Sequence, residues 1–225
     1  MKKSHTKSPT QSGFSLIELL IGMTLTLVVM TIGSTLLASS FAIRNRENQR
    51  SSAIADAQRA LNMMSREIAN AGYGLSSNGI VVGGDSDSTQ IRVRSDLDLS
   101  GATTGDGEDV KYVLVNDANG SFIVRMNLQP TQTTGLIANR IDGLAIYYYD
   151  QAVTYTVGNG VITNVLNSAG GAQAEVTPDL AKYVVLVIRV TLPAVGKPGS
   201  PGYQPPSATQ LVSTVALRNS NLQIY

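Results

Sequence analysis

The sequence contains no cysteine and no tryptophan, and its one histidine, His5, lies among the first residues. Without cysteine there can be no disulfide, thiolate metal site or cysteine nucleophile. A body without histidine also lacks the commonest general base and metal ligand near neutral pH. The motifs of serine hydrolases, P-loop proteins and dinucleotide-binding proteins are absent too. We therefore expect a protein that is not an enzyme.

The charges give no indication of a nucleic-acid partner. The chain has 225 residues and a formal net charge of +1, and no basic stripe follows its first residues. Nucleic-acid-binding domains usually carry such a stripe, so we expect no nucleic acid among the partners. The 21 glycines, with many Ser, Thr and Asn, favour one turn-rich β domain.

Charge and proline are both missing from a long stretch near the N-terminus. No charged residue lies between Leu19 and Ile43, and no proline between Thr10 and Gln129. About 20 apolar residues in a helix cross the hydrocarbon core of a membrane, so we expect a transmembrane helix over residues 14–43. Glu18 lies just inside it. An acid at membrane depth costs about 3 kcal/mol on insertion scales, which suggests a functional role.

The residues before this stretch resemble a leader. Residues 1–13 are polar and carry Lys2, Lys3 and Lys7. Cations before an apolar run keep that end in the cytoplasm, so the rest should lie across the membrane. A secretory signal has its small cleavage-site residue after the apolar run. Here Gly13 precedes the run, and a cut there would remove the leader and keep the anchor.

The run GFSLIE over residues 13–18, after a basic leader and before an apolar helix, resembles the class III signal of type IV pilins and pseudopilins. The resemblance implies that a prepilin peptidase cuts after Gly13, that Phe14 is then N-methylated, and that Glu18 acts in assembly. In a filament, Glu18 would pair with the new Phe14 amine of an adjacent subunit. Removing one partner of a buried pair typically costs about 3–5 kcal/mol. The alternative is an acid near the lipid interface that turns out to water.

The helix is expected to continue beyond the membrane as an amphipathic helix over residues 44–74, ended by Gly72 and Gly74. Its apolar residues are spaced three or four apart, which predicts one buried stripe: Ile54, Ala57, Leu61, Met64, Ile68 and Ala71. This half should be the spine of a β-rich globular head over residues 75–225. The fold class is then α+β and pilin-like: a long N-terminal helix, transmembrane and then amphipathic, packed on an antiparallel β-sheet.

Short apolar runs in the head predict strands, and Asn119-Gly120 and Asn159-Gly160 predict hairpin turns between them. The uniformly apolar run over residues 184–188 predicts a central strand buried on both faces. Residues 194–207 contain seven glycines or prolines and predict an exposed loop, either a contact surface or a tolerated insertion. The expected strands cover residues 80–82, 90–94, 110–115, 122–127, 141–149, 153–157, 161–166, 183–192 and 211–217.

A narrower resemblance lies at the end of the long helix. Residues 63–73, MMSREIANAGY, are similar to the PilW group of minor pilins and to the minor pseudopilin J of type II secretion, and residues 108–114, 141–150 and 214–219 extend this likeness more loosely. It implies a minor pilin that starts or caps a type IV pilus and supports adhesion and twitching motility. The alternatives are pseudopilin J and a membrane-anchored binding module.

The same resemblance implies the partners and the location. The partners would be the prepilin peptidase, other minor and major pilins, the inner-membrane assembly platform and a tip adhesin. The chain would cross the inner membrane once, with its N-terminus cytoplasmic and its head periplasmic, and then enter the pilus at the cell surface.

One acidic segment is a candidate metal site. Asp96, Asp98 and Ser100 have the D-x-D-x-S-G spacing of the first half of a calcium loop. The twelfth loop position is Gly107 instead of glutamate, and Asp106 and Glu108 lie near enough in sequence to substitute. The alternative is a solvated acidic turn. Calcium is the one cofactor that the sequence suggests.

Overall fold

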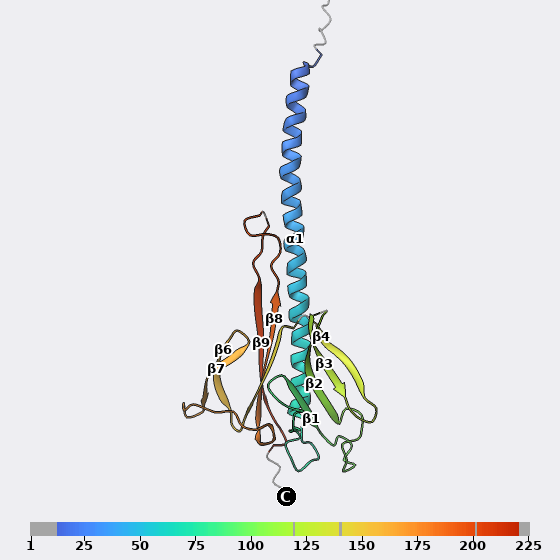
Figure 1. Ribbon diagram of the computed structural model, residues 1–225, viewed down its shortest axis with the longest axis vertical. Helices are drawn as coiled ribbons and strands as arrows, with labels where there is room; N and C mark the ends of the chain where they lie inside the picture. Colours follow the sequence, from blue (N-terminus) through green and yellow to red (C-terminus); the bar gives the residue numbers. More distant parts are fainter. Residues whose placement is uncertain (1–12, 119, 140, 201, 221–225) are drawn as a thin grey trace, which may run out of the picture.

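The computed structural model describes residues 13–118, 120–139, 141–200 and 202–220. One helix, α1 (Leu16–Ala69), dominates the molecule, and a β-rich head surrounds its C-terminal half (Figure 1). At 1.5 Å per residue, the 54 residues of α1 make a rod about 80 Å long. The predicted α+β fold class, with a long N-terminal helix packed on antiparallel strands, is confirmed.

The strands of the head form separate antiparallel sheets instead of the single sheet expected from the sequence. A four-stranded sheet has the order β1-β2-β3-β4, a three-stranded sheet the order β5-β8-β9, and β6 and β7 form a hairpin of their own. The bounds are β1 (Gln90–Arg94), β2 (Asp109–Asp117), β3 (Gly120–Asn127), β4 (Thr133–Asn139), β5 (Gly143–Tyr149), β6 (Val153–Gly158), β7 (Val161–Asn167), β8 (Tyr183–Leu192) and β9 (Ser207–Ala216), with a short 3₁₀ helix at Pro178–Leu180.

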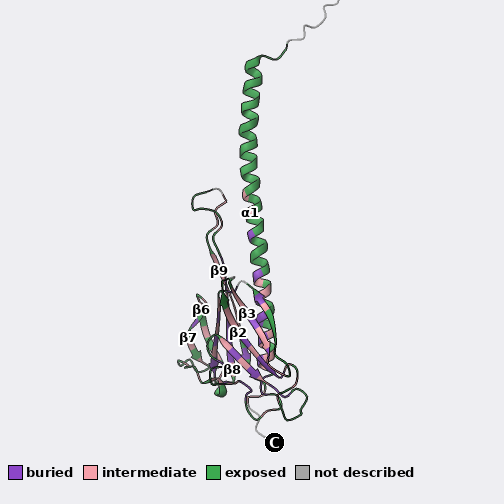
Figure 2. Ribbon diagram, turned by 45° about the vertical axis from the view of Figure 1, so that its right-hand side comes forward, coloured by how far each residue is buried: buried purple, intermediate pink, exposed green. Residues whose placement is uncertain are grey.

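The C-terminal half of α1 packs in the core between the two larger sheets (Figure 1). Its buried face consists of small residues followed by larger ones, and burial begins only in this half (Figure 2). The alanines let strands lie close to the helix axis, and the larger side chains fill the wider space beyond them. Of the predicted apolar stripe, Ile54 is half-buried and the other five residues are buried: Ala57, Leu61, Met64, Ile68 and Ala71. Two alanines that were not predicted, Ala53 and Ala60, are buried as well.

Strand β8 lies between β5 and β9 and is buried on both faces. Val184, Leu186 and Ile188 pack with α1 in the main core. Val185 and Val187 belong to a second cluster under the β6–β7 hairpin. A strand covered on both faces needs a continuous apolar run, and the prediction from residues 184–188 is confirmed.

Two features of the head differ from the expectation based on the sequence, and of the two predicted turns only one lies wholly in the described residues. Residues 80–82 form only an isolated bridge between Ile80 and Val93. Strand β4 was not predicted, because it is a largely exposed edge strand that begins with polar residues. The Asn159-Gly160 turn has φ of 53° and 81°, as predicted, whereas Asn119 lies outside the described residues.

Candidate assembly face and acidic loop

The first described residues form a capped helix start. Ser15 is the N-cap of α1, and its Oγ accepts a hydrogen bond from the Ile17 amide at 3.3 Å. The Glu18 carboxylate accepts from the Ser15 amide at 3.0 Å. Together these bonds satisfy amides that the first turn of a helix leaves unpaired. This capping box was not predicted, although Ser15-x-x-Glu18 is its signature.

The proposed cleavage point lies outside the helix. Gly13 and Phe14 precede the first helical residue, and Phe14 is 89% exposed. Exposed, non-helical backbone before a helix is accessible to a peptidase, because no helical hydrogen bond has to break. Residues 1–12 of the predicted leader, 1–13, lie outside the described residues.

From its start to Ala38, α1 has no tertiary partner in the described structure and exposes its apolar side chains on all sides. This helix is long and apolar enough to cross a membrane, and it is the one such helix among the described residues. All seven hydroxyls between residues 24 and 40 donate to carbonyls three or four positions back, at 2.6–2.9 Å: Thr24, Thr26, Thr31, Ser34, Thr35, Ser39 and Ser40. A hydroxyl that is satisfied inside its own helix can enter lipid without an unpaired donor.

One side of this half has a shallow groove. Glu18, Gly22 and Thr26 follow one another at intervals of four residues along it, between Phe14 and Met30. Gly22 has no side chain, so another helix can approach the backbone closely at this position. The groove therefore places a carboxylate at one end of a surface suited to helix packing.

The C-terminal half of α1 is fixed to the four-stranded sheet by a carboxylate that the sequence analysis did not single out. Glu67 accepts a hydrogen bond from the Tyr112 hydroxyl at 2.6 Å and bonds from the Arg125 guanidinium at 3.0–3.1 Å. Burial and the neighbouring Glu67 charge raise the pKa of Tyr112 far above its usual value, so the hydroxyl stays a donor. Glu67 thus connects α1 with both β2 and β3.

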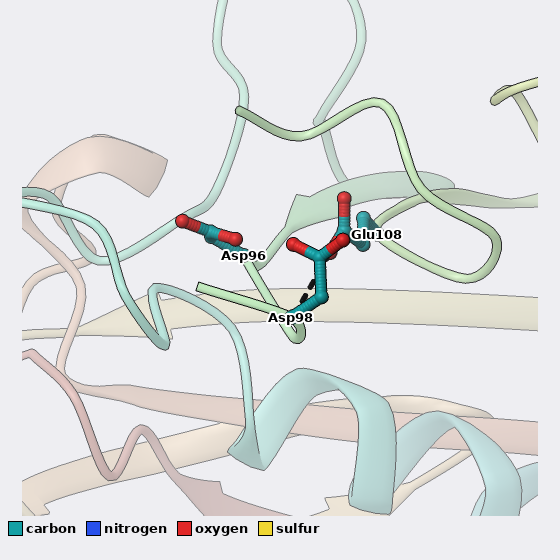
Figure 3. A group of neighbouring side chains, drawn as sticks. All are labelled: Asp96, Asp98 and Glu108. Atoms are coloured by element: carbon teal, nitrogen blue, oxygen red, sulfur yellow. Dashed lines mark hydrogen bonds between the residues drawn. The ribbon is translucent and has the colours of Figure 1, made fainter. Parts of the chain in front are cut away.

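The predicted metal residues only partly come together. The carboxylate oxygens of Asp96, Asp98 and Glu108 lie within 4.8 Å of one another, in the loop between β1 and β2 (Figure 3). Asp96 and Glu108 are each 2% exposed, whereas Asp98 is exposed. Ser100 contributes its amide to both Asp96 and Asp98, and the Asp106 side chain bonds to Asn127 instead of joining the cluster.

Backbone amides already surround the two buried carboxylates. Asp96 accepts from the amides of Ser100 and Gly101 at 2.7–2.9 Å. The Glu108 carboxylate accepts hydrogen bonds from the backbone amides of Leu97, Asp98 and Gly105 at 2.6–3.3 Å. These bonds shape the loop, and the donor set of hard oxygens suits calcium. Calcium binding stays a prediction.

Next to this loop, an ion-pair network covers the outer side of β1 and β2. Asp109 accepts from Arg92 at 2.7 Å and Arg94 at 3.0 Å, while Asp85 bonds to Arg92 and Lys111 at 2.8–3.1 Å. Burial acts to raise the pKa of Asp109, but the hydrogen bonds from Arg92 and Arg94 outweigh it and hold that pKa below its usual value. Hydrogen bonds from Lys111 and Arg92 likewise lower the pKa of Asp85.

Comparison with known families identifies a motif at the N-terminus of the chain. The family model for the prokaryotic N-terminal methylation motif matches residues 8–34. This match supports a type IV pilin-like protein. The matched stretch contains Gly13, Phe14 and Glu18, together with the first part of the exposed apolar helix. No curated protein and no solved structure matches the chain.

Proposed function

We propose that this pilin-like chain is a minor pilin of a type IV pilus, of the PilW group, which helps to start or cap the filament and thereby supports adhesion and twitching motility. The observation that carries the proposal is the methylation motif at the start of a helix whose first half is exposed and apolar. Such a half-helix suits lipid while the subunit waits, and suits a bundle of like helices after assembly. The protein acts by assembly and not by catalysis.

Glu18 has the central role in this proposal. Cutting after Gly13 creates a cationic amine on Phe14, four residues from Glu18 on the same exposed helix end. The Ser15 amide holds the carboxylate at this end of the helix. In a filament, Glu18 neutralises the Phe14 amine of a neighbouring subunit and sets the axial register, because neither charge is stable alone among apolar helices.

The proposed partners follow from the same processing route. They are the prepilin peptidase, other minor and major pilins, the inner-membrane assembly platform and a tip adhesin. The head faces the periplasm before assembly and the cell exterior afterwards. The acidic loop with Asp96, Asp98 and Glu108 takes calcium only as a structural ion of the head.

Intact mass and N-terminal sequencing of the membrane fraction test the processing step. A mature chain that begins at N-methylated Phe14 supports the proposal. A chain that still begins at Met1 in peptidase-competent cells contradicts it and favours a membrane-anchored binding module instead.

Two variants at Glu18 test the assembly step. Glu18→Ala is expected to leave processing largely intact and to remove the subunit from sheared pili. Glu18→Gln keeps the size of the side chain and its bond from the Ser15 amide but removes the charge, so it separates capping from charge pairing. Normal incorporation of the Glu18→Gln subunit would refute the charge pair.

A minor pseudopilin of type II secretion is the second candidate, because the methylation motif serves pilins and pseudopilins alike. The two roles differ in where the mature subunit is found. Recovery in sheared surface filaments supports the pilin role, whereas a subunit confined to the cell envelope and needed for secretion supports the pseudopilin role.

A further inference from the structure

The connection between β8 and β9 extends their hairpin beyond the rest of the head. Here it is named the β8–β9 tip, residues 193–200 and 202–206. The ladder continues through Val195 and Gln204, which exchange backbone hydrogen bonds of 3.0 and 2.9 Å. Further backbone bonds close the end, from Ser200 to Lys197 at 3.0 Å and from Tyr203 to Ser200 at 3.1 Å. Figure 1 shows this tip alongside α1, beyond the strands of both larger sheets.

Two contacts place the β8–β9 tip against α1. The Arg46 guanidinium donates through Nη2 to the carbonyl of Pro205, and Arg46 is only 6% exposed on an otherwise exposed stretch of helix. At the far end, Gly202 lies so close to α1 that a Cβ built there would be 3.1 Å from the Ser39 Cβ. The tip therefore runs along α1 at least from Arg46 to Ser39.

The depth of Ser39 follows from the length of the helix. Ser39 lies 25 residues after Phe14, which is about 38 Å along an α-helix. The hydrocarbon core of a bilayer is about 30 Å thick, and the bilayer is about 40–45 Å thick with its head groups. When Glu18 instead of Phe14 is placed at the inner edge of the hydrocarbon core, Ser39 lies about 32 Å away, which is still in the outer head-group region. The end of the tip therefore lies level with the outer head groups.

The charged side chains exposed at this depth of the membrane are cationic. Lys197 in the tip and Arg44 on α1 are exposed, and Tyr203 in the tip is half-buried. No Asp or Glu occurs between residues 19 and 46 or from residue 180 to residue 225. Lysine and tyrosine are favoured at membrane interfaces, where the charged or polar end reaches water and phosphate while the stem contacts lipid.

We propose that the β8–β9 tip lies in the phospholipid head-group layer on the outer face of the membrane, with Lys197 and Arg44 contacting lipid phosphates. The tip gives the head a second attachment to the membrane besides α1 and fixes its height and tilt before assembly. The proposal rests on α1 spanning the membrane, which the proposed function also requires.

The absence of cysteine allows a direct test, because one introduced cysteine is the single labelling site of the whole chain. Ser200→Cys is labelled with an environment-sensitive fluorophore in the full-length protein, reconstituted in phosphatidylglycerol-containing vesicles whose lipids carry a quencher on the head group. Ser168→Cys, in the exposed turn after β7, is the matched control. Thr31→Cys, with quencher in the acyl chains, reports whether α1 spans the membrane. Head-group quenching at position 200 and none at position 168 supports the proposal.

Two variants in the Ser200→Cys background sharpen the test. Lys197→Gln removes one cationic contact and should lower the head-group-bound population of the tip about fivefold. Gly202→Val places a side chain against Ser39 at a backbone φ of 80°, so it should lift the tip and reduce quenching. When each variant is made in the Thr31→Cys background instead, the signal from position 31 should stay unchanged.

Three results would overturn the proposal. Equal solvent access at positions 200 and 168, with position 31 in lipid, refutes the tip contact and leaves the anchor and the proposed function standing. Shielding of position 200 in assembled filaments but not in vesicles assigns the tip to a neighbouring subunit instead. Position 31 outside lipid would refute the spanning helix, and with it the proposed function.

Discussion

The two halves of α1 accommodate their apolar side chains and satisfy their polar groups in different ways. The half before Ile43 has large apolar side chains exposed on every side, and its hydroxyls bond to carbonyls of the same helix. The half after Ala53 buries one face, and its carboxylate Glu67 is satisfied by Tyr112 and Arg125 from the sheet. The hydroxyls of the first half are satisfied within the helix itself, whereas the Glu67 carboxylate of the second half depends on the head.

The difference shows that helix propensity alone does not distinguish the two regions. Both lie in one uninterrupted helix of 54 residues. What separates them is where each polar group finds its hydrogen bond, because lipid offers none and a protein core offers only those that its neighbours supply. Each change described below acts on one half and should leave the other unaffected.

The largest effect is expected from truncating a buried leucine in the second half, with an exposed leucine of the first half as the control. Leu61 is 3% exposed in the core of the head and Leu27 is 68% exposed in the apolar half. Leu61→Ala should lower the free energy of unfolding of the head by about 2–5 kcal/mol, because it removes buried surface and leaves a cavity. Leu27→Ala should leave that free energy unchanged. Chemical denaturation of the detergent-solubilised chain, followed by tyrosine fluorescence, measures both, and equal losses would contradict the division of the helix.

A smaller effect is expected at the polar attachment of α1 to the sheet. Glu67→Ala leaves the Arg125 guanidinium and the Tyr112 hydroxyl without their acceptor and should destabilise the head by about 1–3 kcal/mol. Glu47→Ala, at an exposed position on the same helix, is the matched control and should stay within about 0.5 kcal/mol of wild type. Thermal unfolding monitored by circular dichroism compares the two. A Glu67→Ala head as stable as the control would show that packing alone holds α1 in place.

Acid should separate the halves as well. The folded-state pKa values of Asp109 and Asp85 are lowered from the reference of 3.8, so their ion pairs stabilise the head above pH 3.8 and are lost as the pH falls through the lowered values. Asp109→Asn should therefore be less stable than wild type at neutral pH, and the gap should narrow below pH 3.8. A pH series of melting temperatures measures this gap, and a constant gap would exclude the network as its source. The apolar half should stay helical throughout.

The smallest effect is expected from a hydroxyl in the apolar half. The Thr26 hydroxyl donates to the Gly22 carbonyl at 2.6 Å. Thr26→Val removes a bond that is local to the helix and leaves no buried partner unpaired, so insertion and helix content should change by less than about 0.5 kcal/mol. Membrane extraction with carbonate and circular dichroism in detergent measure these quantities. A clear loss of insertion would mean that this hydroxyl has a partner outside its own helix.

Much of the fold was predictable because it depends on local pattern. The uncharged run, the apolar stripe from Ala57 to Ala71 and the continuous apolar run in β8 each reflect a single environment along the chain. Both β1 and β8 begin and end at the predicted residues. The Asn159-Gly160 turn follows from backbone preference alone. The order of leader, small residue and apolar run led to Gly13 and Phe14 as processing residues, and processing there stays a prediction.

The remaining features depend on contacts between distant parts of the chain. Strand β4 is held by pairing to β3 and not by an alternating pattern, so Thr133 and Thr134 gave no strand signal. The bond between Tyr112 and Glu67 joins residues 45 positions apart. In the acidic loop the sequence found Asp96, Asp98 and Glu108 but not Asp106's partner Asn127, which comes from β3. The path of the β8–β9 tip along α1 likewise had no local signal.

Because α1 is held by the head at one end, a small tilt of the head is amplified at the other end of the helix. The head holds α1 from Ala53 onward, and Phe14 lies 39 residues before that point, about 58 Å away. One degree of tilt at the head would then displace the Phe14 end by about 1 Å. The contact between Gly202 and Ser39 shortens the unsupported length to 25 residues, or about 38 Å, and reduces that displacement by about a third. Gly202, more than 160 positions from Ser39 in sequence, thus reduces the displacement of the helix end that carries Glu18 when the head tilts.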